Sequence, residues 1–365
     1  MELRNYWWLL IWLFLFGGVS LAFFPKREEI VLGKPVQRWG KLAAAALALP
    51  YVIWAGWRPD YFGDTGQYRS TFLRLPTSLA DIGEYLGQAS KDRGFTVLSI
   101  LFKSLISHSD IVFFLVIAAI QMYCLVRIYR KYSENYWLSM FLFVASADYL
   151  SWMHNGMRQF LAVTMIFAAL PLLIQRRYIP MILVVLLASQ IHLSALVFLP
   201  FIFIVNGKAW NIRTVLFLFG VLAALFFLEE VTGFITSAME DTVYEGDIRY
   251  FESDNGTNLF RVLFYSVPAI LSIPFRSRIE AEDDPLINVC VNLSVVAAGF
   301  YIFSFFTSGI LIGRLPIYFS LANYILIPWL IGELFTPDSA MLVEAGFVGV
   351  YSVYSYIQMH SWGLL

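Results

Sequence analysis

Charged residues are scarce in this chain. Only 14% of its 365 residues are Asp, Glu, Lys or Arg, against about 25% in soluble globular domains. This charge is too sparse to cover a water-exposed surface, so the composition excludes a soluble protein, a disordered chain, a coiled coil and a nucleic-acid-binding protein. The two cysteines, Cys124 and Cys290, each lie inside an apolar run, which argues against a disulfide scaffold or a cysteine metal site.

Hydrophobic residues are abundant instead, at 59% of the chain, and 18% of the residues are aromatic. A backbone amide in lipid finds no water, so each long apolar run is predicted to form a helix and each charged break a loop. We therefore predict an all-α polytopic integral membrane protein, with about twelve transmembrane helices in a single transmembrane domain, 1–365. The predicted runs are 6–24, 42–57, 111–129, 136–151, 160–174, 179–190, 193–205, 214–228, 262–275, 286–305, 315–330 and 342–358.

The sidedness depends on one further apolar stretch, 95–106, which contains Lys103. If this stretch lies at the interface or re-enters rather than spans, fourteen of the 25 Lys and Arg residues fall in short breaks on one side. The positive-inside rule then makes that side cytoplasmic and places both termini outside. We adopt this topology, with the first run, 6–24, as a retained helix. It leaves two large outer loops, 58–110 with interfacial helices and the acidic loop 229–261.

Several arginines fall on the outer side, against the sidedness rule. The guanidinium group is always charged and offers a rigid fork of donors that binds phosphate bidentately. A group of them near helix ends suits an anionic head group carried on a lipid. The alternative is interfacial snorkelling or ion pairs with nearby carboxylates such as Asp60 and Asp64. The outer arginines are Arg58, Arg69, Arg74, Arg93, Arg158, Arg261 and Arg314.

Two groups are candidates for acid–base chemistry. His192 lies in a polar interruption, 189–194, between two apolar runs, and an ionisable group at membrane depth is a functional candidate that can act as a base near neutral pH. The alternative is a structural hydrogen bond that closes a helical hairpin. Asp64 follows the second run, with Tyr68 and Arg69 about one turn further on. It could accept a proton, bind a cation or cap the next helix.

No strong cofactor motif is present. The sequence lacks the glycine-rich loops that cradle nucleotide phosphates. It also lacks a strong metal motif, although Asp64 could hold a divalent cation. We therefore predict no cofactor, and no nucleic acid as a partner.

Four short elements occur in a characteristic order: Asp64-x-x-x-Tyr68, then Asp92-Arg93-Gly94-Phe95, then Asn155-Gly156-Met157-Arg158-Gln159, then His192-x-Ser194-Ala195. Together they resemble the EpsG-like branch of bacterial polysaccharide polymerases, which is similar in role to the Wzy O-antigen polymerases. The resemblance covers about residues 61–200. One departure is Asp92, where the family pattern leads us to expect Glu.

The resemblance implies a glycosyltransferase of the bacterial inner membrane, with a GT-C-like architecture and an active site facing the periplasm. Its donor and acceptor would be oligosaccharide repeat units on undecaprenyl pyrophosphate in the lipid bilayer, and a chain-length regulator is a further partner. We predict Asp64 or His192 as the base. The predicted pyrophosphate and glycan ligands are Tyr68, Arg69, Asp92, Arg93, Arg158, Gln159, Arg261 and Arg314.

Two other functions fit parts of this pattern. A flippase or transporter of lipid-linked glycans should carry charges near the middle of its spans. The predicted spans hold few ionisable groups, namely Glu344 and, if its stretch spans, Lys103, which favours an enzyme. A ligase that moves the glycan to another acceptor would use the same chemistry.

Overall fold

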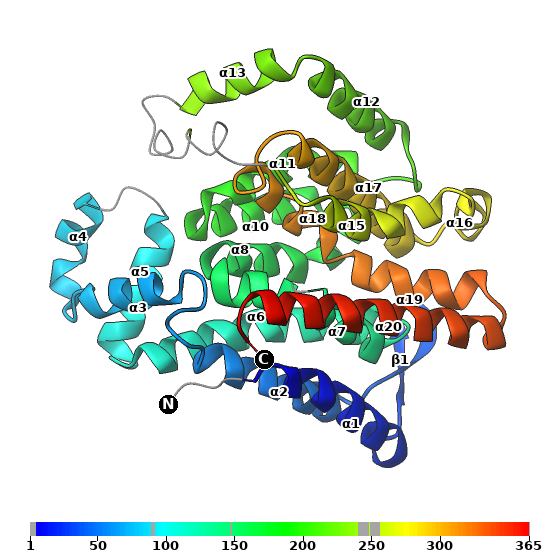
Figure 1. Cartoon of the computed structure of the whole chain (residues 1–365), viewed down its shortest axis with the longest axis horizontal. Helices are drawn as coiled ribbons and strands as arrows, with labels where there is room; N and C mark the ends of the chain where they lie inside the picture. Colours follow the sequence, from blue (N-terminus) through cyan, green and yellow to red (C-terminus); the bar gives the residue numbers. More distant parts are fainter. Residues whose placement is uncertain (1–4, 89–91, 147, 240–247, 249–255, 365) are drawn as a thin grey trace. The chain divides into compact units, whose positions relative to one another are not determined.

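The computed structural model describes residues 5–88, 92–146, 148–239, 248 and 256–364 (Figure 1). Most of the described chain is helical, and its one two-stranded hairpin is short. The helices pack into two compact units. The first comprises Met1–Ala168, Leu187–Leu193 and Ile331–Leu365, and the second comprises Ala169–Leu186 and Ser194–Leu330.

The first unit is built around α2 and α6. One face of α2 is lined by alanines, including Ala43 and Ala44, which are buried. Small side chains let helix backbones approach closely where no hydrophobic effect drives association. Helix α20 lies beside α7 and α1 in this unit (Figure 1). The elements are α1 (Trp7–Phe23), β1 (Arg27–Val31), β2 (Lys34–Arg38), α2 (Lys41–Gly56), α3 (Thr65–Arg74), η1 (Leu79–Asp81), α4 (Ile82–Gln88), α5 (Arg93–Leu105), α6 (Asp110–Tyr132), α7 (Tyr136–Ala145), the π-helix η2 (Tyr149–Asn155), α8 (Met157–Ala168) and α20 (Pro337–Ser361).

The all-α prediction missed the hairpin of β1 and β2, which pairs antiparallel from Arg27 opposite Arg38 to Val31 opposite Lys34. Its turn residues Leu32 and Gly33 both have positive φ, as tight hairpin turns require. Arg130, in the last turn of α6, donates to both carboxylate oxygens of Glu29, at 2.8 and 3.0 Å. This hydrogen bonding lowers the pKa of Glu29. The hairpin is therefore anchored to the C-terminal end of α6, which we call the hairpin end of the unit.

The hairpin end brings together several of the basic residues that the sidedness argument places on one side. Arg38 donates from Nε to the backbone carbonyl of Lys131 at 3.0 Å, so the basic break before α2 and the basic end of α6 meet. At the opposite end of these helices, α6 begins at Asp110 and Arg58 follows the end of α2. The cytoplasmic assignment of the hairpin end remains a prediction.

The uncertain stretch 95–106 forms most of α5, a helix of 13 residues. The charge of its lysine is satisfied within the protein. Lys103 Nζ donates to three backbone carbonyls at the end of α3, those of Phe72, Leu73 and Leu75, at 2.6 to 3.0 Å. The last carbonyls of a helix lack partners within it. Lys103 therefore caps α3 and ties it to α5.

The second unit surrounds α17, and 89% of the apolar stretch of this helix is buried. Asn292 of α17 donates to the carbonyls of Val205 and Lys208, both at 3.0 Å, and accepts from Trp210 N–H, so a buried amide organises the turn between α11 and α12. The elements of this unit, of which α10, η3 and α19 each include residues of the first unit, are α9 (Leu170–Ile174), α10 (Tyr178–Ile191), η3 (Leu193–Val197), α11 (Phe198–Ile204), α12 (Ile212–Phe226), α13 (Leu228–Met239), α15 (Leu259–Ser272), α16 (Arg276–Glu282), α17 (Pro285–Phe305), η5 (Ile312–Arg314), α18 (Ile317–Ser320) and α19 (Asn323–Leu334).

The apolar helices identify a membrane protein. Among the described residues, α6, α17 and α20 are long and apolar enough to cross a bilayer, and three bent helix pairs raise this number to as many as six. Six shorter apolar helices complete the set, and each of the twelve predicted runs overlaps one of these helices or bent helix pairs. The count of twelve crossings and the GT-C-like architecture remain predictions.

Two predicted boundaries differ from the structure. The run 136–151 is not one regular helix, because α7 ends at Ala145 and a π-helix follows. The predicted acidic loop 229–261 begins as helix α13, which is bent by 94° from α12. The central part of that loop, 240–247 and 249–255, lies outside the described residues.

Candidate functional site

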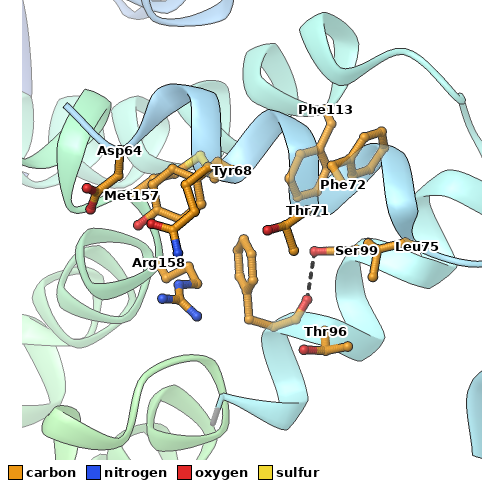
Figure 2. Close-up of a pocket in the computed structure, with 12 residues that line it drawn as sticks. Asp64, Tyr68, Thr71, Phe72, Leu75, Thr96, Ser99, Phe113, Met157 and Arg158 are labelled. Atoms are coloured by element: carbon orange, nitrogen blue, oxygen red, sulfur yellow. Dashed lines mark hydrogen bonds between the residues drawn. The ribbon is translucent and has the colours of Figure 1, made fainter. Parts of the chain in front are cut away.

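A cavity of about 110 Å³ opens in the first unit between α3, α5, α6 and α8 (Figure 2). Its polar wall contains Asp64, Tyr68 and Arg158, and its apolar wall contains Phe95, Phe113 and Met157. Three of the four sequence elements that carry the family resemblance thus contribute a side chain to one cavity. Asp64 and Arg158 are 94 positions apart in the chain, so only the fold brings these elements together.

Asp64 occupies the N-cap position of α3, but within the described part of the chain its side chain makes no capping hydrogen bond. Its backbone N–H instead donates to Asn155 Oδ1 at 2.9 Å. The preceding residue, Gly63, has φ +53°, and a Cβ there would lie 2.3 Å from the same amide oxygen. A glycine is therefore needed for this close approach. The Asp64 side chain therefore does not cap α3, and its carboxylate lies in the wall of the cavity.

Arg158 lies in the first turn of α8, and Asp92 holds it in place. Arg158 Nη1 is 3.1 Å from Asp92 Oδ2, and its guanidinium carbon lies 5.7 Å from the centre of the Tyr68 ring. The Asp92 side chain is 5% exposed, whereas that of Arg158 is 37% exposed. The pair is therefore anchored on the buried carboxylate side, and the arginine keeps a solvent-accessible edge beside Tyr68 (Figure 2).

The fourth element, at His192, reaches the site through Asp92. The backbone N–H of Leu193 donates to Asp92 Oδ1 at 3.4 Å, and Asp92 itself adopts the left-handed conformation, with φ +51°. The break predicted at His192 is confirmed, because α10 ends at Ile191. The half-buried His192 is not part of the cavity wall. It lies next to the residue that positions the Asp92–Arg158 pair, and its role as a base remains a prediction.

Gly94, between Asp92 and Phe95, lets the start of α5 pack closely against the end of α10. A Cβ at Gly94 would lie 2.4 Å from the backbone oxygen of Gln190, and neither backbone can move without shifting its helix. We expect Gly94→Ala to lower the free energy of unfolding by about 1 to 3 kcal/mol and to reduce activity by displacing Asp92. Thermal unfolding of the purified protein measures the first effect.

The matched control for this substitution is Gly83→Ala in α4, where no described atom lies within 4 Å of the new Cβ. It should be neutral or slightly stabilising, since alanine is the better helix former. Equal stability of the two variants would contradict the close packing of α5 on the end of α10.

Arg69 is paired with nearby carboxylates, the alternative to phosphate binding that was considered for the outer arginines. It forms ion pairs with two carboxylates, Asp60 and Asp110, the second at 2.5 Å. Two anions already balance its charge, and it links the start of α6 to the segment before α3. Arg69 is therefore better placed to orient α3, which carries Tyr68, than to bind a phosphate directly.

The other predicted ligands lie elsewhere. Arg93 begins α5, next to Asp92, and Gln159 is buried in α8, next to Arg158. Arg261 and Arg314 belong to the second unit, where Arg261 lies 5.8 and 6.0 Å from the ring centres of Tyr265 and Tyr301. The structure thus brings together Asp64, Tyr68, Asp92 and Arg158. Roles for the other residues remain predictions.

Two buried residues were not predicted as part of the site. Arg58 is 1% exposed and donates to the carbonyl of Met153 at 2.8 Å and to Met157 Sδ at 3.3 Å. Its guanidinium carbon also lies 4.2 Å from the centre of the Phe114 ring. Burial lowers its pKa to about 10, so the group stays charged at neutral pH. Its position directly after an apolar run was the one sequence signal for this helix-joining role.

His154 is the second, and it is fully buried among aromatic rings. The ring centres of Tyr149, Phe62 and Tyr6 lie 4.8, 5.2 and 5.4 Å from its own. Burial, together with the nearby Arg58 charge, holds the pKa of His154 well below its usual range. The folded protein therefore contains a neutral imidazole, which is structural rather than catalytic.

This burial predicts a pH effect on stability. Below about pH 6.5 the unfolded chain takes up a proton at position 154 that the folded chain does not, so acidification favours unfolding by up to about 1.4 kcal/mol per pH unit. His154→Phe keeps the aromatic packing and should remove this contribution. Denaturant unfolding in detergent at pH 7.5, 6.5 and 5.5 measures it. A slope equal in both proteins would contradict a neutral buried histidine.

No metal site is defined by the residues that the structure covers, since no three His, Cys, Asp or Glu side chains among them come together. The possibility that Asp64 holds a divalent cation remains a prediction. The chemistry that the site does offer is a carboxylate that makes no capping hydrogen bond among the described residues and an anchored, partly exposed guanidinium, both in the polar wall of one cavity.

The fold and the cavity define a polytopic helical membrane protein with a polar site where the ends of several helices meet. A comparison with family models gives a match to the EpsG family over residues 41–363, and the chain belongs to that family. Neither curated proteins nor solved structures give a match to this chain. The resemblance found in the four sequence elements is thereby confirmed. EpsG membership indicates a membrane polymerase of polysaccharides with glycosyltransferase-like chemistry.

Proposed function

We propose that this protein joins oligosaccharide repeat units into a surface polysaccharide by glycosyl transfer at the outer face of the bacterial inner membrane. Donor and acceptor are both carried on undecaprenyl pyrophosphate. The observation that carries the proposal is the shared cavity of Asp64 and Arg158, where a base and an anchored cation face the same small volume.

The proposed step needs no nucleotide, because the pyrophosphate already activates the donor. An acceptor hydroxyl oxygen forms a bond to the anomeric carbon of the growing chain, and the bond from that carbon to the pyrophosphate oxygen breaks. Asp64 takes the hydroxyl proton. Arg158 stabilises the negative charge on the departing pyrophosphate, and the buried Asp92 keeps the guanidinium in position for it.

The size of the cavity limits what enters it. A cavity of about 150 Å³ holds one benzene molecule, so the volume of about 110 Å³ admits only a small group. We infer that the reacting hydroxyl or phosphate enters, while the rest of each oligosaccharide lies outside. Leu105 and Ile106, at the end of α5, are 67 and 68% exposed, which supports contact of this helix with the bilayer that carries the prenyl chains.

A reconstitution assay tests the proposal. Purified protein in detergent is incubated with undecaprenyl-pyrophosphate-linked repeat units, and the products are separated by length. We expect repeat units to be joined in a ladder of products without any second compartment. A flippase would elongate nothing in detergent. A ligase would transfer single units to a different acceptor, so either of these results would reject the polymerase.

A further inference from the structure

A second cavity lies at the hairpin end of the first unit, next to the C-terminal end of α6, whereas the candidate site includes Phe113 near the N-terminal end of that helix. Its volume is about 370 Å³, and it is lined by segments of α1, α7 and α20 and by the chain before α2. Helix α6 separates the two cavities along its length of 23 residues, about 34 Å. The polymerase chemistry proposed above makes no use of this second cavity.

The polar wall of this cavity carries charges of both signs. Glu134 and Glu344 supply carboxylates, and Lys26 supplies an ammonium group. Glu344 is half-buried in α20, and its Oε1 accepts from Asn135 Nδ2 at 3.0 Å. A carboxylate has about four acceptor positions, and this hydrogen bond uses one of them while fixing the orientation of the group.

Two indole rings complete the wall, and both are held in place. Trp39 packs edge-on against Tyr136 with ring centres 5.4 Å apart, and Trp137 donates from Nε1 to the carbonyl of Leu13 at 2.8 Å. A cation attracted by carboxylates is also attracted by the faces of such rings. The cavity therefore has the features of a receptor for an organic ammonium group.

The third wall is apolar and suited to lipid. Phe14 is 43% exposed, and no described atom lies within 4 Å of a Cβ built at Gly18. Helix α20 is apolar enough to span a membrane, yet only 11% of its apolar stretch is buried inside the protein. A half-buried carboxylate on such a lipid-accessible helix is expensive unless a partner is present.

We propose that this cavity binds the head group of a phospholipid that carries an ammonium group, such as phosphatidylethanolamine. The ammonium group lies between Glu344, Glu134 and the indole rings, the phosphate lies beside Lys26, and an acyl chain follows the surface of α1 past Gly18. The arrangement of both charge signs around one cavity matches the zwitterion, in which the phosphate and the ammonium group are two carbons apart.

The test uses the full chain, purified in dodecyl maltoside without lipid. Phosphatidylethanolamine, phosphatidylcholine or phosphatidylglycerol is added in mixed micelles at equal mole fraction, and thermal unfolding is followed at increasing lipid. A ligand that binds the folded state raises its unfolding temperature by mass action. We expect the largest rise with phosphatidylethanolamine and a smaller one with phosphatidylcholine, whose methylated nitrogen donates no hydrogen bond to the carboxylates.

Glu344→Gln keeps an acceptor for Asn135 and removes the charge, so it should fold normally and bind phosphatidylethanolamine at least tenfold more weakly. The matched control is Glu28→Gln, an exposed hairpin carboxylate at the same end of the unit, which should behave as the wild type. Soluble glycerophosphoethanolamine distinguishes the head group alone from the lipid, and it should produce no rise at equal concentration.

Three results would overturn the proposal. Equal stabilisation by phosphatidylglycerol would indicate recognition of phosphate alone. Equal stabilisation by glycerophosphoethanolamine would indicate a soluble ligand. Unchanged phosphatidylethanolamine binding in Glu344→Gln would show that the lipid binds elsewhere.

Discussion

Replacing Arg158 by alanine is expected to lower the rate of polymer synthesis about a hundredfold, because one charge-assisted contact to the departing pyrophosphate contributes about 2 to 4 kcal/mol in the transition state. The rate is measured as the initial rate of product lengthening in the reconstituted assay. In cells, polymer length should fall at normal protein levels.

The alanine variant also leaves Asp92, with its nearly buried side chain, without its ion-pair partner, which can destabilise the fold. Arg158→Lys separates the two effects, since it keeps a positive charge near Asp92 and loses the planar fork. It should unfold at close to the wild-type temperature and still be slow. Arg74→Ala, at an exposed arginine of α3, is the control and should be fully active. Full-length polymer from both Arg158 variants would refute the assignment.

Asp64→Asn is expected to reduce the rate by about 10² to 10⁴-fold, the usual contribution of a general base. The substitution preserves shape and removes the ability to take a proton. Because the Asp64 side chain makes no capping hydrogen bond among the described residues, the unfolding temperature should not change. This combination of lost activity and preserved stability distinguishes a catalytic carboxylate from a structural one.

The control is Asp60→Asn, which removes a carboxylate from the segment just before α3 and weakens its ion pair with Arg69. It should cost less than tenfold in rate. If the two variants were equally active, His192 would become the candidate base. In that case His192→Gln should abolish synthesis while Asp64→Asn does not.

Much of the site could be predicted from short patterns. Asp64 follows the second apolar run with Tyr68 one turn on, Arg158 is one of the outer arginines, and both belong to elements of the family resemblance. Among so few charged groups, the position of each one carries information, because burying a charge in lipid is costly. The identification of the family rests on the order of these elements, and the comparison over residues 41–363 supports it.

The partners of these residues could not be predicted. The ion pair of Asp92 with Arg158 joins residues 66 positions apart, and it depends on the left-handed backbone at Asp92 and on the packing of Gly94 against Gln190. Arg69 has the same residue type and a similar setting, yet it is neutralised by Asp60 and Asp110. Sequence position alone does not show whether an arginine is held for ligand binding, as Arg158 is, or already paired with carboxylates, as Arg69 is.

Composition and hydropathy by themselves determined that this chain is a helical membrane protein with its rare polar groups near helix ends, because lipid requires internal backbone hydrogen bonding and excludes most charge. Tertiary packing decided which of those groups act together. It left the carboxylate of Asp64 in a cavity wall, set Arg158 on a buried acid, and used Arg58, Lys103 and His154 to join helices. The physical reason is that a side chain's role depends on which partners lie within a few ångströms, and those partners come from distant helices.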